Sequence, residues 1–154
     1  MKRESAELIH RRKQANVDHW NGLYPIAIFS SDGTAEHVNE YFLWKFGIEE
    51  ASLFIGKYNL LNDQVFRRKK SVYEKIEKAF NGEKVTLCNF KAPFKTFMDM
   101  GIIKGIPPEM PHMDANLLPT YENGKFDSVY LIFHVLNGSS HKDTKAQREE
   151  RKAR

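Results

Sequence analysis

The sequence has a single cysteine and no long apolar run. Of its 154 residues only Cys88 is a cysteine, so an internal disulfide and a zinc site built from several thiolates are excluded. No run approaches the ~20 apolar residues that cross a bilayer, and the first residues lack the apolar centre of a secretory signal. We therefore expect a soluble, cytoplasmic protein that has no membrane partner and whose folding depends on side-chain packing.

Motifs of the common enzyme classes are also missing. The sequence has no G-x-S-x-G, H-E-x-x-H or G-x-G-x-x-G segment and no phosphate-binding glycine loop. Cys88 has no histidine near it in the sequence, and we interpret it as a small buried apolar residue rather than a nucleophile. We predict that the chain is not an enzyme.

Positive charge is not concentrated in the body of the chain. The net charge of +4 divides into +2 for residues 1–20, −1 for residues 21–138 and +3 for residues 139–154. The basic run at residues 67–70 has no interleaved aromatics and is typical of an exposed helix face. A nucleic-acid partner is therefore not expected.

Apolar residues make up 41% of the chain and aromatics 12%, which is enough for a folded core. The length fits one domain with a short extension at each end. We divide the chain into a helical extension at residues 1–22, a domain at residues 23–138 with an insertion at about 92–114, and a charged tail at residues 139–154. For the tail we expect a frayed helix or disorder.

Periodicity predicts the elements of the first half. A helix is expected over Ser5–Trp20, with a thin apolar stripe that is interrupted by Lys13. The stripe comprises Ala6, Ile9, Val17 and Trp20. A hairpin with a turn at Asp32–Gly33 follows, with His37 at its surface, and then two short helices over residues 40–56. A long helix is predicted from about Gln64 to Phe80, ended by Asn81 and Gly82.

The second half predicts three strands, at residues 84–90, 115–121 and 127–136, with a hairpin turn at Asn123–Gly124. The fold class is therefore α+β, with a five-stranded antiparallel sheet, the short helices and one long helix on one face, and the N-terminal helix flanking it. The last strand is apolar on both faces, and Tyr130, Ile132 and Leu136 lie on the face away from the core. A second layer must therefore cover that face.

The insertion holds four of the five methionines and four of the six prolines. We favour a surface segment packed by its own side chains over a ligand-binding lid, which stays open as the alternative. His112 and Met113 are soft ligands that could suit haem iron or copper(I), together with Met98, Met100 and Met110. Hydrophobic packing is favoured over a metal site, because no regular ligand spacing occurs.

Residues from about Leu23 to Leu136 resemble a PAS domain of the bacterial sensory-box type. PIAIFSSDGTAEHVNEYFLWKFG is similar to the first hairpin and first helix of that family, and IGKYNLLND to its short central helices. SVYEKIEKAFNGE is similar to its long helix, and LLPTYENGKFDSVYLIF to its final hairpin. The match covers about three-quarters of the chain, with the motifs in the family's order.

The resemblance implies tests for cofactors. Flavin-binding light sensors of this family carry a reactive cysteine in an asparagine-cysteine-arginine motif, whereas this chain has Tyr58, Asn59 and Leu60 there. Photoactive flavin is therefore disfavoured. Asn89 matches a flavin-contacting asparagine, which leaves non-photochemical flavin as a minor alternative. Haem held by a histidine on or beside the long helix is disfavoured, because no histidine occurs between His37 and His112.

The resemblance also implies a candidate pocket, lined by apolar side chains with Asn89 as its polar group. Its residues are Asn59, Val72, Ile76, Phe80, Leu87, Asn89, Ala115, Leu117, Leu131 and Phe133. The same residues would line a filled core, which we favour slightly. The ligand itself stays unidentified.

Three functions follow as alternatives. The first is a sensory or regulatory module in signal transduction, which binds a small apolar or mixed-polarity ligand or a downstream signalling protein and relays a change of packing. The second is a dimerisation or adaptor module without a ligand, and the third a lipid-carrier or enzyme-like cavity protein. We also predict a homodimer, in which the N-terminal helix helps to cover the outer sheet face of the partner. In the alternative, a monomer, this helix covers the outer face of its own sheet.

Overall fold

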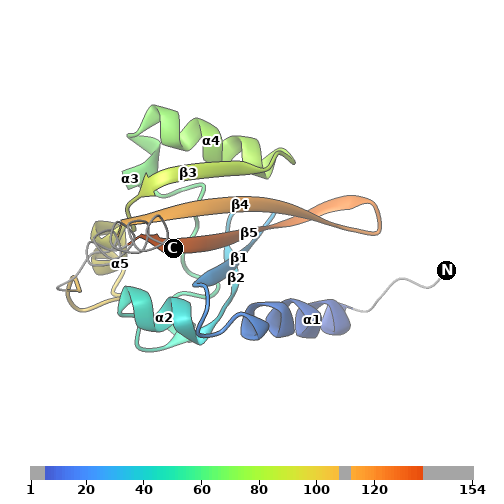
Figure 1. The fold of residues 1–154 in the computed structure, drawn as a ribbon, viewed down its shortest axis with the longest axis horizontal. Coiled ribbons are helices and arrows are strands. Elements are labelled where there is room, and N and C mark those ends of the chain that lie inside the picture. Colours follow the sequence, from blue (N-terminus) through green and yellow to red (C-terminus); the bar gives the residue numbers. More distant parts are fainter. Residues whose placement is uncertain (1–5, 108–111, 137–154) are drawn as a thin grey trace, which may run out of the picture.

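Five antiparallel strands form one sheet in the order β2-β1-β5-β4-β3 (Figure 1). The computed structural model describes residues 6–107 and 112–136. The strands are β1 (Ile26–Ser30), β2 (Ala35–Val38), β3 (Val85–Phe90), β4 (His112–Glu122) and β5 (Lys125–Leu136). The last strand in the chain is therefore the central one, and β2 and β3 form the two edges of the sheet.

Helices pack on both faces of this sheet. In the described part of the chain, one face carries five short or medium helices, and the other carries a single helix. The five are α2 (Glu40–Phe46), the 3-10 helix η1 (Ala51–Leu53), α3 (Gln64–Arg67), α4 (Lys70–Phe80) and α5 (Phe94–Asp99), and the single helix is α1 (Ala6–His19). The α+β class and the five-stranded antiparallel sheet predicted from the sequence are confirmed.

Both predicted hairpin turns are present. Gly33 has a φ of 95° and Asn123 and Gly124 have φ values of 53° and 78°, which is the left-handed region that these tight turns require. The Asp32 carboxylate supports the first turn by accepting a hydrogen bond of 2.9 Å from the Thr34 amide. Turn chemistry thus determines the register of β1 with β2 and of β4 with β5.

The predicted long helix is two helices, which corrects the sequence prediction. α3 ends after one turn, and Lys69 between the helices has a non-helical backbone with φ −103° and ψ 87°. In a continuous helix Phe66 and Ile76 would point about 80° apart. The break allows both side chains to be buried against the sheet, at 1% and 0% exposure.

The insertion contributes to the main core, which is also a correction. Phe94, Phe97, Ile102 and Ile103 are all at most 5% exposed and pack with the inner face of the sheet. α5 therefore does not form a separate surface unit packed by its own side chains. The spacing of three between Phe94 and Phe97 was the helical signal, but the surrounding proline and methionine obscured it.

A buried carboxylate anchors α5 to the centre of the fold. Asp63 accepts hydrogen bonds from the Tyr58 hydroxyl at 2.5 Å, the Thr96 hydroxyl at 2.7 Å and the Val65 amide at 2.9 Å. Burial, together with the charge of Asp63, raises the pKa of Tyr58 well above its ordinary value. Tyr58 therefore stays protonated and donates to this carboxylate, which caps α3 at the same time.

α1 lies on the outer face of its own sheet, beside β1 and β2 (Figure 1). Val17 is fully buried against Ile26 and Ile28, and Tyr130 and Ile132 of β5 pack partly against this cluster. The predicted stripe is therefore correct at Val17 but wrong at Trp20, which is 42% exposed, and at Ala6, which is also exposed.

Asn39 joins α1 to the rest of the domain. Its side chain donates to the Val17 carbonyl at 3.1 Å and the Tyr24 carbonyl at 2.8 Å, and accepts from the Phe42 amide at 2.9 Å and the Ile26 amide at 3.2 Å. All hydrogen-bonding positions of this fully buried amide are used. The end of α1, the start of β1 and the start of α2 are thereby held together.

Within 6–107 and 112–136, no helix has the length and apolar character needed to span a bilayer. In the same ranges, His, Cys, Asp and Glu side chains form no group of three that could hold a metal ion. The side chain of His112, residue Met110 and the charged tail at 139–154 lie outside what the structure describes, whereas Met113 is buried in the core.

Candidate functional site

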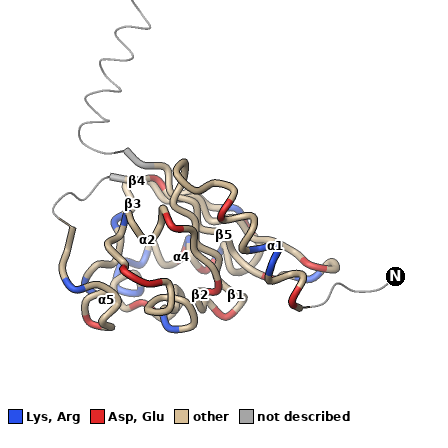
Figure 2. The backbone as a smooth tube through the Cα atoms, turned by 90° about the horizontal axis from the view of Figure 1, so that it is seen from below, with Lys and Arg blue, Asp and Glu red and all other residues tan. Residues whose placement is uncertain are grey.

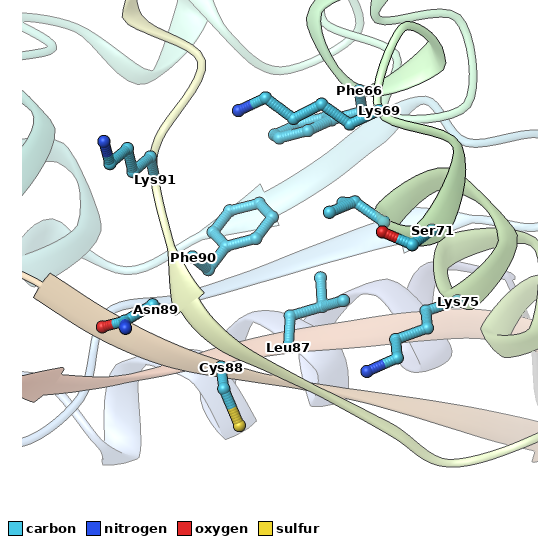
Figure 3. A pocket seen from close by; sticks show the side chains of 10 residues that line it. Phe66, Lys69, Ser71, Lys75, Leu87, Cys88, Asn89, Phe90 and Lys91 are labelled. Atoms are coloured by element: carbon cyan, nitrogen blue, oxygen red, sulfur yellow. The ribbon is translucent and has the colours of Figure 1, made fainter.

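A groove of about 360 Å³ lies between edge strand β3 and the two helices α3 and α4 (Figure 3). Its lining combines aliphatic and aromatic side chains with lysines and small polar groups. The lining residues are Phe66, Lys69, Ser71, Val72, Lys75, Leu87, Cys88, Asn89, Phe90 and Lys91. The volume falls within the range of small-molecule sites, which are usually about 300 to 1,000 Å³.

An irregularity in β3 creates the apolar floor of this groove. The pairing of β3 with β4 shifts between Leu87 and Phe90, and Asn89 has a φ of 51°. The Asp114 carboxylate stabilises this conformation by accepting a hydrogen bond of 3.1 Å from the Asn89 amide. Leu87 and Phe90 are consequently both buried, three positions apart, although strict alternation would separate them onto opposite faces.

The predicted inward direction of Asn89 is therefore wrong. Asn89 and Cys88 are both exposed, so the expected burial of Cys88 is wrong as well. In Figure 3 their side chains point away from Phe66 and Lys69, at the margin of the groove. A regular strand would have buried Asn89 and Lys91, and the bulge places Phe90 inside instead.

Three lysines border the groove. Lys69 precedes α4, Lys75 lies on its second turn and Lys91 directly follows β3. All three are exposed, and Figure 3 shows their side chains surrounding Phe90 and Leu87. Lys69 is the N-cap residue of α4, and its ammonium group cannot accept a hydrogen bond from the first amides of that helix, so no side-chain cap is present.

Among the residues that the structure describes, the space between the inner sheet face and the helices is almost filled. The cavity between the inner sheet face and the helices holds about 10 Å³, close to the minimum for one water molecule. Most of the predicted pocket residues belong to the core around this cavity, and two of them, Leu131 and Phe133, line it. These core residues include Ile76, Phe80, Ala115, Leu117, Leu131 and Phe133. The other strand residues of the predicted pocket point into the core as expected and help to fill it. They are Leu87, Ala115, Leu117, Leu131 and Phe133.

Asn59 lies apart from both the groove and this interior. Its amide group donates to the Asp32 carbonyl at 3.1 Å and the Thr34 hydroxyl at 3.3 Å, and its oxygen accepts from the Asn62 amide at 3.1 Å. A Cβ atom on Gly33 would lie 2.5 Å from that oxygen. Asn59 thus packs tightly against the first hairpin turn and stabilises it.

Sequence reasoning did not place Phe66, Lys69, Ser71, Lys75, Phe90 and Lys91 at a site. Of the predicted residues, the groove brings together Val72, Leu87 and Asn89. A usable signal was the failure of period-two alternation in VTLCNFK, where the apolar residues Leu87 and Phe90 are three apart. The placement of Lys69 beside β3 depends on the break between α3 and α4, which the sequence did not reveal.

A second cluster of polar groups lies under α1. His37 was predicted at the surface but is only 1% exposed, because α1 covers it. Its ring lies 4.3 Å from the His10 ring, and its Nδ1 atom is 2.8 Å from the Gln14 side-chain oxygen. Burial, with His10 and Lys13 nearby, lowers the pKa of His37 to about 4. His37 is therefore neutral at pH 7.

Basic and acidic residues are interspersed along the elements of the described chain (Figure 2). The lysines around the groove are thus a local feature of one surface within a domain of balanced charge. This distribution differs from the continuous basic face of most folded nucleic-acid-binding proteins.

No protein-family model matches the sequence, and no curated protein matches it. Solved structures do match. The PAS domain of BvgS from Bordetella pertussis has a TM-score of 0.60 at 14% identity, covering 96% of this chain and 99% of that one. A PAS domain of an HTR-like protein from Haloarcula marismortui has a TM-score of 0.50 at 17% identity, with 84% and 93% covered.

A phage VqmA, solved as its complex with DPO, has a TM-score of 0.56 at 12% identity and covers 95% of this chain and 61% of that one. The chain therefore has a PAS fold, and the resemblance to sensory-box PAS domains drawn from the sequence is confirmed at the level of the fold.

Proposed function

We propose that this chain is a sensory PAS module in signal transduction, which binds a small ligand in the groove between α4 and β3 and relays a change of packing. The observation that carries this proposal is the groove of about 360 Å³ on a fold whose interior is filled. The buried floor at Leu87 and Phe90 connects the groove directly to the core. A ligand on this floor would therefore alter contacts within the sheet.

The sheet offers a route from the groove to α1. β3 pairs with β4, β4 with β5, and the β5 residue Asp127 contacts Lys13 on α1 at 2.7 Å. Asn39 connects the C-terminal end of α1 to β1. A shift of β3 on ligand binding would reach α1 through these pairings, and α1 is the element that a partner protein could sense.

Native mass spectrometry and the ultraviolet-visible spectrum of the purified protein test this function. A co-purifying mass or chromophore, together with altered hydrogen exchange in α1 after its removal, would support the proposal. If the protein carries no ligand and a broad set of small molecules leaves both its stability and the exchange of α1 unchanged, the sensory function is wrong.

A dimerisation or adaptor module without a ligand is the second candidate, and the interior volume of about 10 Å³ favours it. Leu8, Trp20 and Leu23 are 54%, 42% and 62% exposed and could contact a second copy, although α1 already covers part of its own sheet. Sedimentation of the full chain and of a form without residues 1–20 tests this. A full-length monomer at micromolar concentration would eliminate the homodimer. A truncated form that stays soluble in the same oligomeric state would show that α1 does not cover an apolar surface that the domain needs to hide.

A further inference from the structure

We infer that the groove between α4 and β3 takes an anionic small molecule that has a flat apolar part, such as an aromatic carboxylate or phosphate. This inference rests on the proposed function and specifies the ligand class of the same site. Two independent features of the groove define the two parts of such a molecule.

The floor defines the apolar part. Phe66 and Phe90 are stacked, with their ring centroids 5.0 Å apart and an interplanar angle of 28°. They are 1% and 6% exposed and Leu87 is 4% exposed, so only a small part of each side chain faces the groove. A flat ring fits against this narrow aromatic floor better than a bulky polar group, because the floor has no hydrogen-bonding atoms.

The rim defines the anionic part. Lys69, Lys75 and Lys91 come from three separate positions in the chain, and the fold gathers them around one concave surface. Among the residues that the structure describes, none of the three forms an ion pair within 4.0 Å. Asp114 of β4 accepts a hydrogen bond from the Asn89 backbone amide and is not among the residues that line the groove. Several positive charges around a concave apolar surface attract an anion.

Hydrogen-bond donors beside the lysines complement a carboxylate or phosphate. The Ser71 side chain lines the groove at the first turn of α4, where the backbone amides have no acceptor within the helix. These groups add to the attraction of the lysines. The limited volume of the groove and the net charge of −1 for residues 21–138 favour a small molecule over a nucleic acid.

The test uses a matched pair of probes, 2-naphthoate and its neutral isostere 2-naphthamide, with the full-length protein. Binding is followed by amide chemical shifts in NMR titrations. We expect 2-naphthoate to bind in a saturable way and to shift the amide signals of Phe66, Leu87 and Phe90, and to bind at least about fivefold more tightly than 2-naphthamide. Its binding should weaken at higher salt, because the lysines are exposed.

Substitutions test the role of each lysine. Lys69→Gln, Lys75→Gln and Lys91→Gln should each weaken 2-naphthoate binding about two- to fivefold, as expected for the loss of one exposed ionic contact. Lys57→Gln is the matched control, since Lys57 is exposed outside the groove and the net charge of the protein changes equally. It should leave binding unchanged.

Three outcomes would overturn the inference. If 2-naphthamide binds in the groove as tightly as 2-naphthoate, the anionic class is wrong while the groove and the proposed function stand. If Lys57→Gln weakens binding as much as the groove variants, the attraction is nonspecific. If neither probe shifts the groove amides, the groove is not the ligand site, and the proposed function loses its main support.

Discussion

The Lys13 ammonium group of α1 lies 2.7 Å from the Asp127 carboxylate of β5 and 3.4 Å from the Glu36 carboxylate of β2. The Lys13 side chain is only 7% exposed. Burial alone lowers the pKa of Lys13, but its hydrogen bond to Asp127 and the charge of Glu36 outweigh burial and raise that pKa. Lys13 therefore stays charged and fixes α1 to two strands of the sheet.

Lys13→Met should lower the free energy of unfolding by about 1 to 3 kcal/mol, because it leaves two neighbouring carboxylates without their cation. Urea denaturation followed by circular dichroism measures the change. Lys95→Met is the control, since Lys95 pairs with Asp99 on the surface and should change stability by less than about 0.5 kcal/mol. Equal effects of the two substitutions would contradict a structural role for the Lys13 pair.

Stability should depend on the protonation of His37. Its pKa is lowered to about 4 in the folded protein, so the unfolded chain binds the proton more readily between that value and its ordinary 6.5. The contribution of neutral His37 to stability is therefore fully present above pH 6.5 and is lost as the pH falls toward 4. From about pH 7.5 to 4.5 we expect His37 to account for a loss of about 2 to 3 kcal/mol.

The comparison with His37→Gln isolates this contribution from carboxylates that titrate in the same range. Unfolding free energies are measured at several pH values for both proteins. The substituted protein should show the shallower dependence on pH. Parallel curves for the two proteins would show that His37 does not contribute to this dependence.

Phe97→Ala should lower the free energy of unfolding by about 3 to 5 kcal/mol, because Phe97 is 2% exposed and its truncation leaves a cavity in the core. The neighbouring Met98 is 41% exposed, and Met98→Ala should cost no more than about 0.5 kcal/mol. Thermal and chemical denaturation compare the two. A small effect at Phe97 would mean that α5 is not part of the core in solution.

Asn59→Ala should lower stability by about 1 to 2 kcal/mol, because it removes the hydrogen bonds that hold the first hairpin turn. The same substitution should leave 2-naphthoate binding unchanged, since Asn59 does not line the groove. Asn81→Ala, at an exposed position, is the control for stability. If Asn59→Ala instead weakens 2-naphthoate binding without lowering stability, Asn59 belongs to the ligand site.

The candidate site could be predicted only in part, and β3 explains why. Leu87 was placed correctly because it alternates with polar neighbours. Asn89 was not, since a bulge held by Asp114 changes the direction of every later residue in the strand. Such a bulge depends on a hydrogen bond between residues 25 positions apart, which local periodicity does not contain.

By itself, the sequence determined the number and order of the five strands, the two hairpin turns and the apolar inner faces of most strands. These features depend on local backbone preferences, as at Gly33 and Asn123, and on side-chain alternation. Only the tertiary structure decided that α1 buries His37, that α5 enters the core and that three lysines meet around one groove. Each of these arises from contacts between distant segments, where burial and charge depend on which element packs against which.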